Sequence, residues 1–154
     1  MKKTILFKTL IDILYFLHLI GLLGMIFILP FGIVNINQVN MNVEDWSLFF
    51  WIIAIVSFST YIIFLRGLYY LRKMTRFLLS KKYFSELIIS NLKKSGTHFL
   101  LTGILSLFVI ILLWISKLYE GKLELVYDIN LMIPLFLMII GMFFRLSSNY
   151  ISNY

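Results

Sequence analysis

The 154-residue sequence contains no cysteine, only two prolines and few charged residues. Without cysteine, the chain has no disulfide, no thiolate zinc site, no cysteine nucleophile and no palmitoylation site. Charged residues make up 14% of the chain, whereas roughly 25% is usual in a soluble domain. Because 61% of the residues are hydrophobic, too few polar side chains remain to cover a soluble core. The composition therefore predicts one integral membrane domain.

Four apolar stretches are long enough to cross a bilayer as helices, which takes about 20 residues. They cover residues 10–31, 46–65, 99–116 and 130–146. Polar loops follow the first and third stretches, at residues 32–45 and 117–129. The apolar run at 10–31 exceeds the roughly 7–15 residues of a signal-peptide core, so we expect a first span there. The predicted fold is all-α, a four-helix transmembrane bundle over residues 1–154.

The segment between the second and third spans, residues 66–97, is strongly basic, and we call it the basic hub. It contains one acid, Glu86, and eight of the 14 Lys and Arg residues: Arg66, Arg72, Lys73, Arg76, Lys81, Lys82, Lys93 and Lys94. With four spans, Lys2, Lys3, Lys8 and Arg145 also lie on the hub side, and only Lys117 and Lys122 lie opposite. Since Lys and Arg are enriched in cytoplasmic loops, this asymmetry predicts a multi-pass protein of the bacterial inner membrane with both termini in the cytoplasm.

The spacing within the hub predicts a helical hairpin between the second and third spans. The second helix continues past Arg66, residues 80–83 form a turn, and Ser85 caps a short amphipathic helix. Gly96 is positioned to end that short helix.

The predicted hairpin presents side chains that could bind a cytoplasmic partner. Phe84, Ile88 and Leu92 recur at four-residue spacing and form an apolar face, while Arg72 and Arg76 form a basic pair on another face. We therefore take these five residues as candidate docking residues.

Asp12 lies about one turn inside the first span, and a carboxylate at that depth is a candidate functional group. One interpretation is an ion pair at the headgroup level with Arg66 or Arg145, which end the second and fourth spans. The other is a proton relay.

His18 is deeper in the same span, at a depth that residue counting also assigns to Ser57, Thr60 and Ser106. Thr102 shares a helix face with Ser106. Such a polar seam serves either helix association through modest hydrogen bonds or a path for a substrate or proton. No metal-binding, phosphate-binding or catalytic motif is present, so we expect no cofactor and no enzymatic activity.

The basic hub is also expected to attract anionic lipid headgroups. Because membrane orientation already accounts for the positive charge, we do not expect a nucleic-acid partner.

The hub carries three short elements that resemble a known family: Leu71-Arg72-Lys73-Met74, Tyr83-Phe84-Ser85-Glu86 and Asn91-Leu92-Lys93-Lys94-Ser95-Gly96. Together with the opening from Lys2-Lys3 to Leu29-Pro30-Phe31-Gly32, they resemble the domain-of-unknown-function 2975 family of small four-helix bacterial membrane proteins. The resemblance implies a membrane partner for a cytoplasmic helix-turn-helix regulator, and it implies no catalytic residues. After the fourth span this chain continues with Ser147-Ser148-Asn149-Tyr150, where that family often has an acidic tail.

These observations predict a non-enzymatic regulatory or interaction protein of the membrane that engages a cytoplasmic partner. The alternative is a small transporter, channel or immunity-type protein that uses the polar seam around His18.

Overall fold

The computed structural model describes residues 2–28, 48–79, 85–119 and 129–152, and in this part of the chain every element is an α-helix. The helices are α1 (Lys2–Ile28), α2 (Leu48–Leu79), α3 (Glu86–Tyr119) and α4 (Ile129–Ser152). All four are long and apolar enough to cross a membrane. The prediction of an all-α chain with four candidate spans is therefore confirmed for the described residues. The predicted loop at 32–45 lies outside them, as do residues 120–128 of the predicted loop at 117–129. For residues 117–119 and 129 the loop prediction is wrong, because they belong to α3 and α4.

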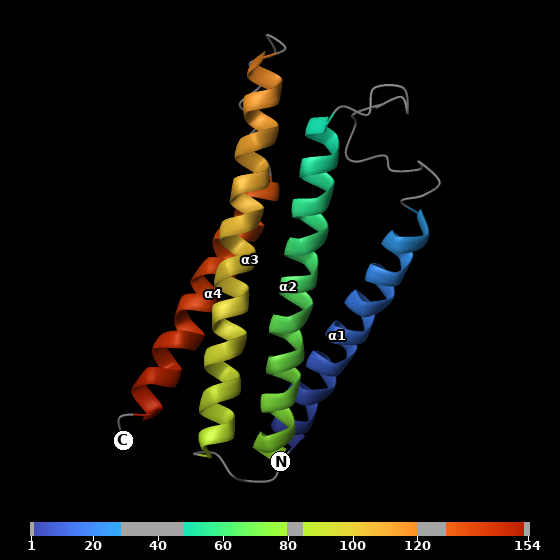
Figure 1. Cartoon of the computed structure of the whole chain (residues 1–154). Helices are drawn as coiled ribbons and strands as arrows, with labels where there is room; N and C mark the ends of the chain where they lie inside the picture. Colours follow the sequence, from blue (N-terminus) through green and yellow to red (C-terminus); the bar gives the residue numbers. More distant parts are fainter. Residues whose placement is uncertain (1, 29–47, 80–84, 120–128, 153–154) are drawn as a thin grey trace.

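The helices pack in chain order, as Figure 1 shows. Close contacts between described helices join α1 to α2, α2 to α3, and α3 to α4. In Figure 1, α1 meets α2 near the N-terminus and diverges from it toward the opposite end. The arrangement is thus an open helical bundle in which α1 packs against a single neighbour. The start of α1 and the end of α4 lie at the same end of the molecule as the end of α2 and the start of α3.

The described part of the basic hub consists of the C-terminal part of α2 and the N-terminal part of α3, and each is continuous with an apolar stretch of its helix. α3 starts at Glu86, and the carbonyl of Ser85 accepts hydrogen bonds from Ile88 N at 2.9 Å and Ile89 N at 3.3 Å. The described hub residues 66–79 and 86–97 are helical, as predicted, and the predicted turn at 80–83 lies outside the described residues. The predicted cap by the Ser85 side chain is not formed, because Ser85 Oγ is buried without a hydrogen-bond partner within the ranges that the structure describes. The prediction that Gly96 ends a short helix is wrong, because α3 runs through it without a break.

Gly96 is instead a point of close approach between α3 and α4. A Cβ atom at Gly96 would lie 2.7 Å from the carbonyl oxygen of Gly141, and one at Gly141 would lie 2.6 Å from the backbone nitrogen of Leu100. Small residues allow membrane helices to bring their backbones together in this way. The glycine therefore serves interhelical packing, and the sequence pattern alone did not distinguish this role from a helix end.

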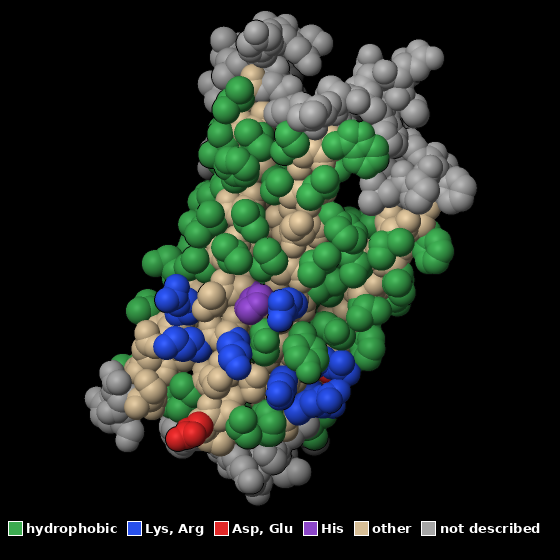
Figure 2. Space-filling view, viewed as in Figure 1, with side chains coloured by type: hydrophobic (Ala, Val, Ile, Leu, Met, Phe, Trp, Pro, Cys, Tyr) green, Lys and Arg blue, Asp and Glu red, His purple; other side chains and the backbone are tan. Residues whose placement is uncertain are grey.

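The buried core lies in the hub half of the molecule. Its members come from α1, α2 and α3 and are Ile11, Leu68, Leu71, Met74, Ile88, Leu92 and Phe99. Toward the other end the helices expose large apolar side chains, including Ile55 at 62%, Phe136 at 63% and Ile139 at 64%. Such surfaces suit a lipid environment, where helices gain no hydrophobic free energy by covering them. Figure 2 shows the same division, with basic side chains below and apolar ones above on the face in view.

Candidate functional site

Asp12 is the centre of a small charged cluster between α1 and α2. Arg72 Nε donates a hydrogen bond to Asp12 Oδ1 at 2.6 Å, and Lys8 Nζ lies 3.2 Å from Oδ2. The Arg72 and Asp12 side chains are 18% and 20% exposed. Such partly shielded charge-assisted hydrogen bonds are stronger than neutral ones.

The predicted partners of Asp12, Arg66 and Arg145, are not its partners in the structure. Both arginine side chains are exposed, and the carboxylate of Asp12 is paired with Arg72 instead. The prediction placed the start of the first span level with the ends of the second and fourth spans, and so paired Asp12 with Arg66 or Arg145. In the antiparallel pair the register is shifted by more than one turn, because α2 stays helical beyond residue 65 and carries Arg72 to the level of Asp12.

Two aromatic rings of α1 also contact the guanidinium of Arg72. Its Cζ atom lies 4.6 Å from the ring centroid of Phe16 and 5.1 Å from that of Tyr15. Cation–π contacts of this kind stabilise a guanidinium most where water is partly excluded. Arg72 therefore stabilises the contact between α1 and α2. The sequence analysis had predicted it to be a docking residue for a partner.

His18 packs into an aromatic contact between α1 and α2. Its ring centroid is 5.1 Å from that of Phe64 and 6.1 Å from that of Tyr61. Its Nδ1 lies 2.8 Å from the carbonyl of Leu14, one turn back on α1. The Tyr61 hydroxyl donates to the backbone carbonyl of His18 at 2.9 Å. These contacts join the two helices, and the imidazole itself bonds within its own helix.

Hydrogen bonds of His18 and of the two threonines in the predicted polar layer do not join these residues to one another. Thr60 donates to the carbonyl of Val56 at 2.7 Å, and Thr102 donates to the carbonyl of His98 at 2.8 Å, each within its own helix. Ser57 is exposed and Ser106 is half-buried. Residue counting assigned Ser57 to the depth of His18, whereas the α2 rings that His18 contacts are those of Tyr61 and Phe64, about one to two turns further along the helix.

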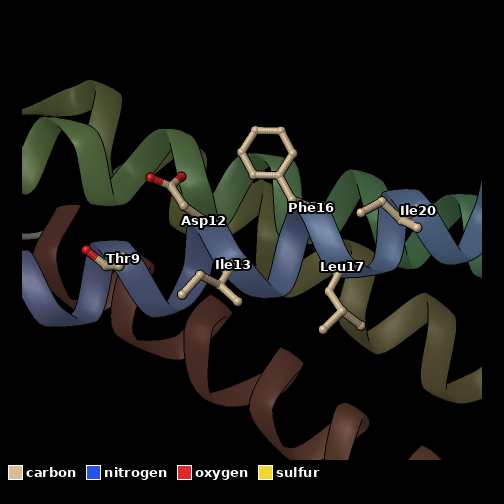
Figure 3. Close-up of a pocket in the computed structure, with 6 residues that line it drawn as sticks. All are labelled: Thr9, Asp12, Ile13, Phe16, Leu17 and Ile20. Atoms are coloured by element: carbon tan, nitrogen blue, oxygen red, sulfur yellow. The ribbon is translucent and has the colours of Figure 1, made fainter.

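One hollow in the described part of the chain lies on α1 beside Asp12, with a volume of about 390 Å³. Figure 3 shows its lining residues, all from α1: Thr9, Asp12, Ile13, Phe16, Leu17 and Ile20. His18 is not among them, so this hollow does not join the residues of the predicted seam. Among the residues searched, no group of three or more His, Cys, Asp or Glu side chains could hold a metal ion.

The apolar face that was predicted to bind a partner is buried at its two described residues. Ile88 is 4% exposed and Leu92 is 9% exposed, and both belong to the core cluster. Phe84 lies outside the described residues. The prediction is therefore wrong for Ile88 and Leu92, because the spacing that marks an apolar face is the same whether a partner or the neighbouring helix covers it. Arg76 is exposed, as a docking residue must be.

A second cluster, which the sequence reasoning missed, lies between α2 and α3 at the start of the basic half. The rings of Tyr70 and His98 are 5.2 Å apart, and Lys94 Nζ lies 5.7 Å from the centroid of Tyr70. His98 Nδ1 is 2.7 Å from the carbonyl of Lys94. The sequence does contain a pattern that could have indicated this cluster. Arg66 and Tyr70 are four residues apart on one helix, Lys94 and His98 are four residues apart on the next, and residues at this spacing share a helix face.

The chain matches no protein-family model, no curated protein and no solved structure. The resemblance to the domain-of-unknown-function 2975 family stays a prediction.

Proposed function

We propose that this chain is a non-enzymatic interaction protein of a bacterial inner membrane that engages a cytoplasmic protein partner. Its basic half and both termini would face the cytoplasm. Support for this orientation comes from the Lys and Arg asymmetry of the sequence and from the position of the start of α1 and the end of α4 at the same end of the molecule as the basic hub (Figure 1). The four candidate spans agree with an integral membrane location.

The partner surface is assigned to the basic tip, which we define as Lys73 and Arg76 near the inner end of α2. Both side chains are exposed. No described carboxylate lies within ion-pair distance of either, since the ion pairs in this part of the chain are those of Asp12. This observation carries the proposal: the apolar hub face is sealed in the core, and the basic side chains beside it are open. An acidic surface is the complement that such a tip favours.

A regulator with a helix-turn-helix fold is the partner class that the family resemblance implies, and it remains the specific proposal for the partner. The polar side chains Thr60 and Thr102 favour a structural over a transport role, because their hydroxyls donate to carbonyls of their own helices.

The partner proposal is tested by cross-linking in intact cells. A photoreactive residue replaces Leu87, which is 53% exposed in the first turn of α3. We expect a discrete cross-linked protein that is lost in the variant Lys73→Gln/Arg76→Gln and kept in Arg66→Gln/Lys94→Gln, which removes the same charge from exposed positions elsewhere. Equal yields in both variants would contradict the assignment of the tip.

The orientation is tested separately, and the absence of native cysteine makes the test simple. Asn40→Cys and Lys93→Cys are introduced one at a time and exposed to a membrane-impermeant maleimide in spheroplasts. We expect the first to react directly and the second only after the membrane is opened. The reverse pattern would invert the proposed topology.

A further inference from the structure

We propose that the seam between α2 and α3 binds the phosphate of an anionic phospholipid headgroup. The site, called the headgroup seam, consists of Arg66 and Tyr70 on α2 and Lys94 and His98 on α3. It rests on the membrane location of the chain and is independent of the proposed protein partner.

The headgroup seam is held in place by close packing of the two helices beneath it. Ser95, which is fully buried, donates from Oγ to the carbonyl of Gly67 at 2.9 Å. A Cβ atom at Gly67 would lie 2.8 Å from the ring of Phe99 and 3.2 Å from Cβ of His98. The missing side chain therefore lets α3 approach α2 at the point where His98 meets Tyr70.

The contacts across the seam fix the positions of its polar groups. The Tyr70 ring contacts both the His98 ring, 5.2 Å away, and the Lys94 ammonium, 5.7 Å away. Arg66 is one turn before Tyr70 on the same face of α2. An anion in the seam would meet the ammonium and the guanidinium, with the Tyr70 hydroxyl as a further donor. His98 is a positioning residue, because its ring orders Tyr70 while Nδ1 bonds to the carbonyl of Lys94.

The electrostatic balance of the seam favours an anion. Arg66 and Lys94 are both exposed, and in the described part of the chain neither has a carboxylate at ion-pair distance. Asp12 is occupied by Arg72 and Lys8. Figure 2 shows basic side chains gathered around a histidine on this half of the molecule. A phosphate is the complement to this pair of cations.

The position of the seam along the helices favours a lipid as the source of that phosphate. Residues 51–65 of α2 and residues 99–115 of α3 contain no charged side chain, and the seam begins directly beyond both stretches. Lys and Arg at such a boundary attract acidic headgroups, and tyrosine is favoured at the same level. The seam therefore lies where a headgroup phosphate lies when the apolar stretches cross the hydrocarbon layer.

The test measures lipid retention by the purified full chain, using native mass spectrometry of detergent complexes titrated with phosphatidylglycerol or phosphatidylcholine. We expect phosphatidylglycerol to bind roughly tenfold to thirtyfold more weakly to Arg66→Gln/Lys94→Gln than to the native chain, because two cations are removed. The charge-preserving variant Arg66→Lys/Lys94→Arg should retain most of the binding. The matched variant Lys73→Gln/Arg76→Gln should bind the lipid like the native chain.

Equal weakening in both glutamine variants, or none in either, would overturn the proposal, because binding would then follow total charge or other residues. A further arm adds excess inorganic phosphate. Displacement of phosphatidylglycerol by phosphate alone, at the concentration of the lipid, would mean that the seam takes soluble phosphate and would also overturn the proposal. The lipid assay contains no partner protein, so it tests the headgroup seam alone. The cross-linking assay at Leu87 tests the partner proposal for the basic tip. Failure of one proposal is therefore distinguishable from failure of the other.

Discussion

Arg72 on α2 donates from Nε to Oδ1 of Asp12 on α1 at 2.6 Å, while its guanidinium lies over the ring of Phe16 at 4.6 Å. Close packing of α1 in the described part of the chain is against α2. The two residues therefore stabilise the contact that positions α1, together with the bond from Tyr61 to the His18 carbonyl at 2.9 Å.

Breaking this ion pair is expected to loosen α1. Asp12→Asn and Arg72→Gln should each lower the free energy of unfolding by about 1.5 to 3 kcal/mol, the range for hydrogen bonds to charged groups. The double variant should lose less than the sum, since both single variants remove the same interaction. Denaturant titration of the four proteins in detergent micelles gives the coupling energy, and strict additivity would show that the pair is not coupled.

The same variant also has a structural readout. Ile20→Cys on α1 and Ile55→Cys on α2 are exposed positions for spin labels in a chain without native cysteine. We expect Asp12→Asn to broaden the distance distribution between them in a dipolar electron resonance measurement. An unchanged distribution would show that α1 is held without the ion pair.

Ile88 is expected to contribute to stability because it belongs to the core. Ile88→Ala should destabilise the protein by about 2 to 5 kcal/mol, as usual for a large apolar core residue. Leu87→Ala is the matched control, since Leu87 is 53% exposed and its neighbour Ile88 is 4% exposed. Thermal unfolding in detergent compares the two, and equal midpoints would contradict the assignment of Ile88 to the core.

Gly96 tests the contact between α3 and α4. The added Cβ of Gly96→Ala would lie 2.7 Å from the Gly141 carbonyl oxygen, so the helices must separate at a cost of about 1 to 3 kcal/mol. Gly24→Ala is the control, because no atom lies within 4 Å of its added Cβ. Alanine in an open helical position is expected to be neutral or stabilising. Unfolding by denaturant should rank the variants in this order, and the opposite order would refute the close approach.

Ser95 tests the contact beneath the headgroup seam. Ser95→Ala removes the hydrogen bond to the Gly67 carbonyl and should lower stability by about 0.6 kcal/mol, a typical value between membrane helices. Ser95→Val adds volume at a fully buried position and should cost more, about 1 to 3 kcal/mol. Unfolding midpoints measured side by side test this order. A valine variant as stable as the alanine variant would indicate unoccupied space at the seam.

Much of the fold follows from composition and from the lengths of the apolar stretches. An apolar run of about 20 residues has to satisfy its backbone hydrogen bonds internally when it lies in lipid, so it becomes a helix whatever its neighbours are. The four helices were therefore predictable. The helical hub was predictable too, because Leu68, Leu71 and Leu78 keep helical spacing.

The candidate sites were less predictable, because they depend on rotation and register between helices. Counting residues gave similar depths to His18, Ser57 and Ser106, but depth does not say which face of a helix meets its neighbour. For Asp12 the sequence left an ion pair and a proton relay open; the structure shows an ion pair, but with Arg72, which the shifted register of α1 against α2 brings to it.

The sequence by itself determined that the chain forms four helices with a strongly basic end, because charge and hydropathy are properties of the residues alone. Only the tertiary structure decided what each hub residue does. Ile88 and Leu92 entered the core, Arg72 joined α1, and Tyr70 met His98 across α2 and α3. The physical reason is that interhelical contacts depend on close approach at positions such as Gly67 and Gly96, and these select one rotation among several that the apolar pattern allows.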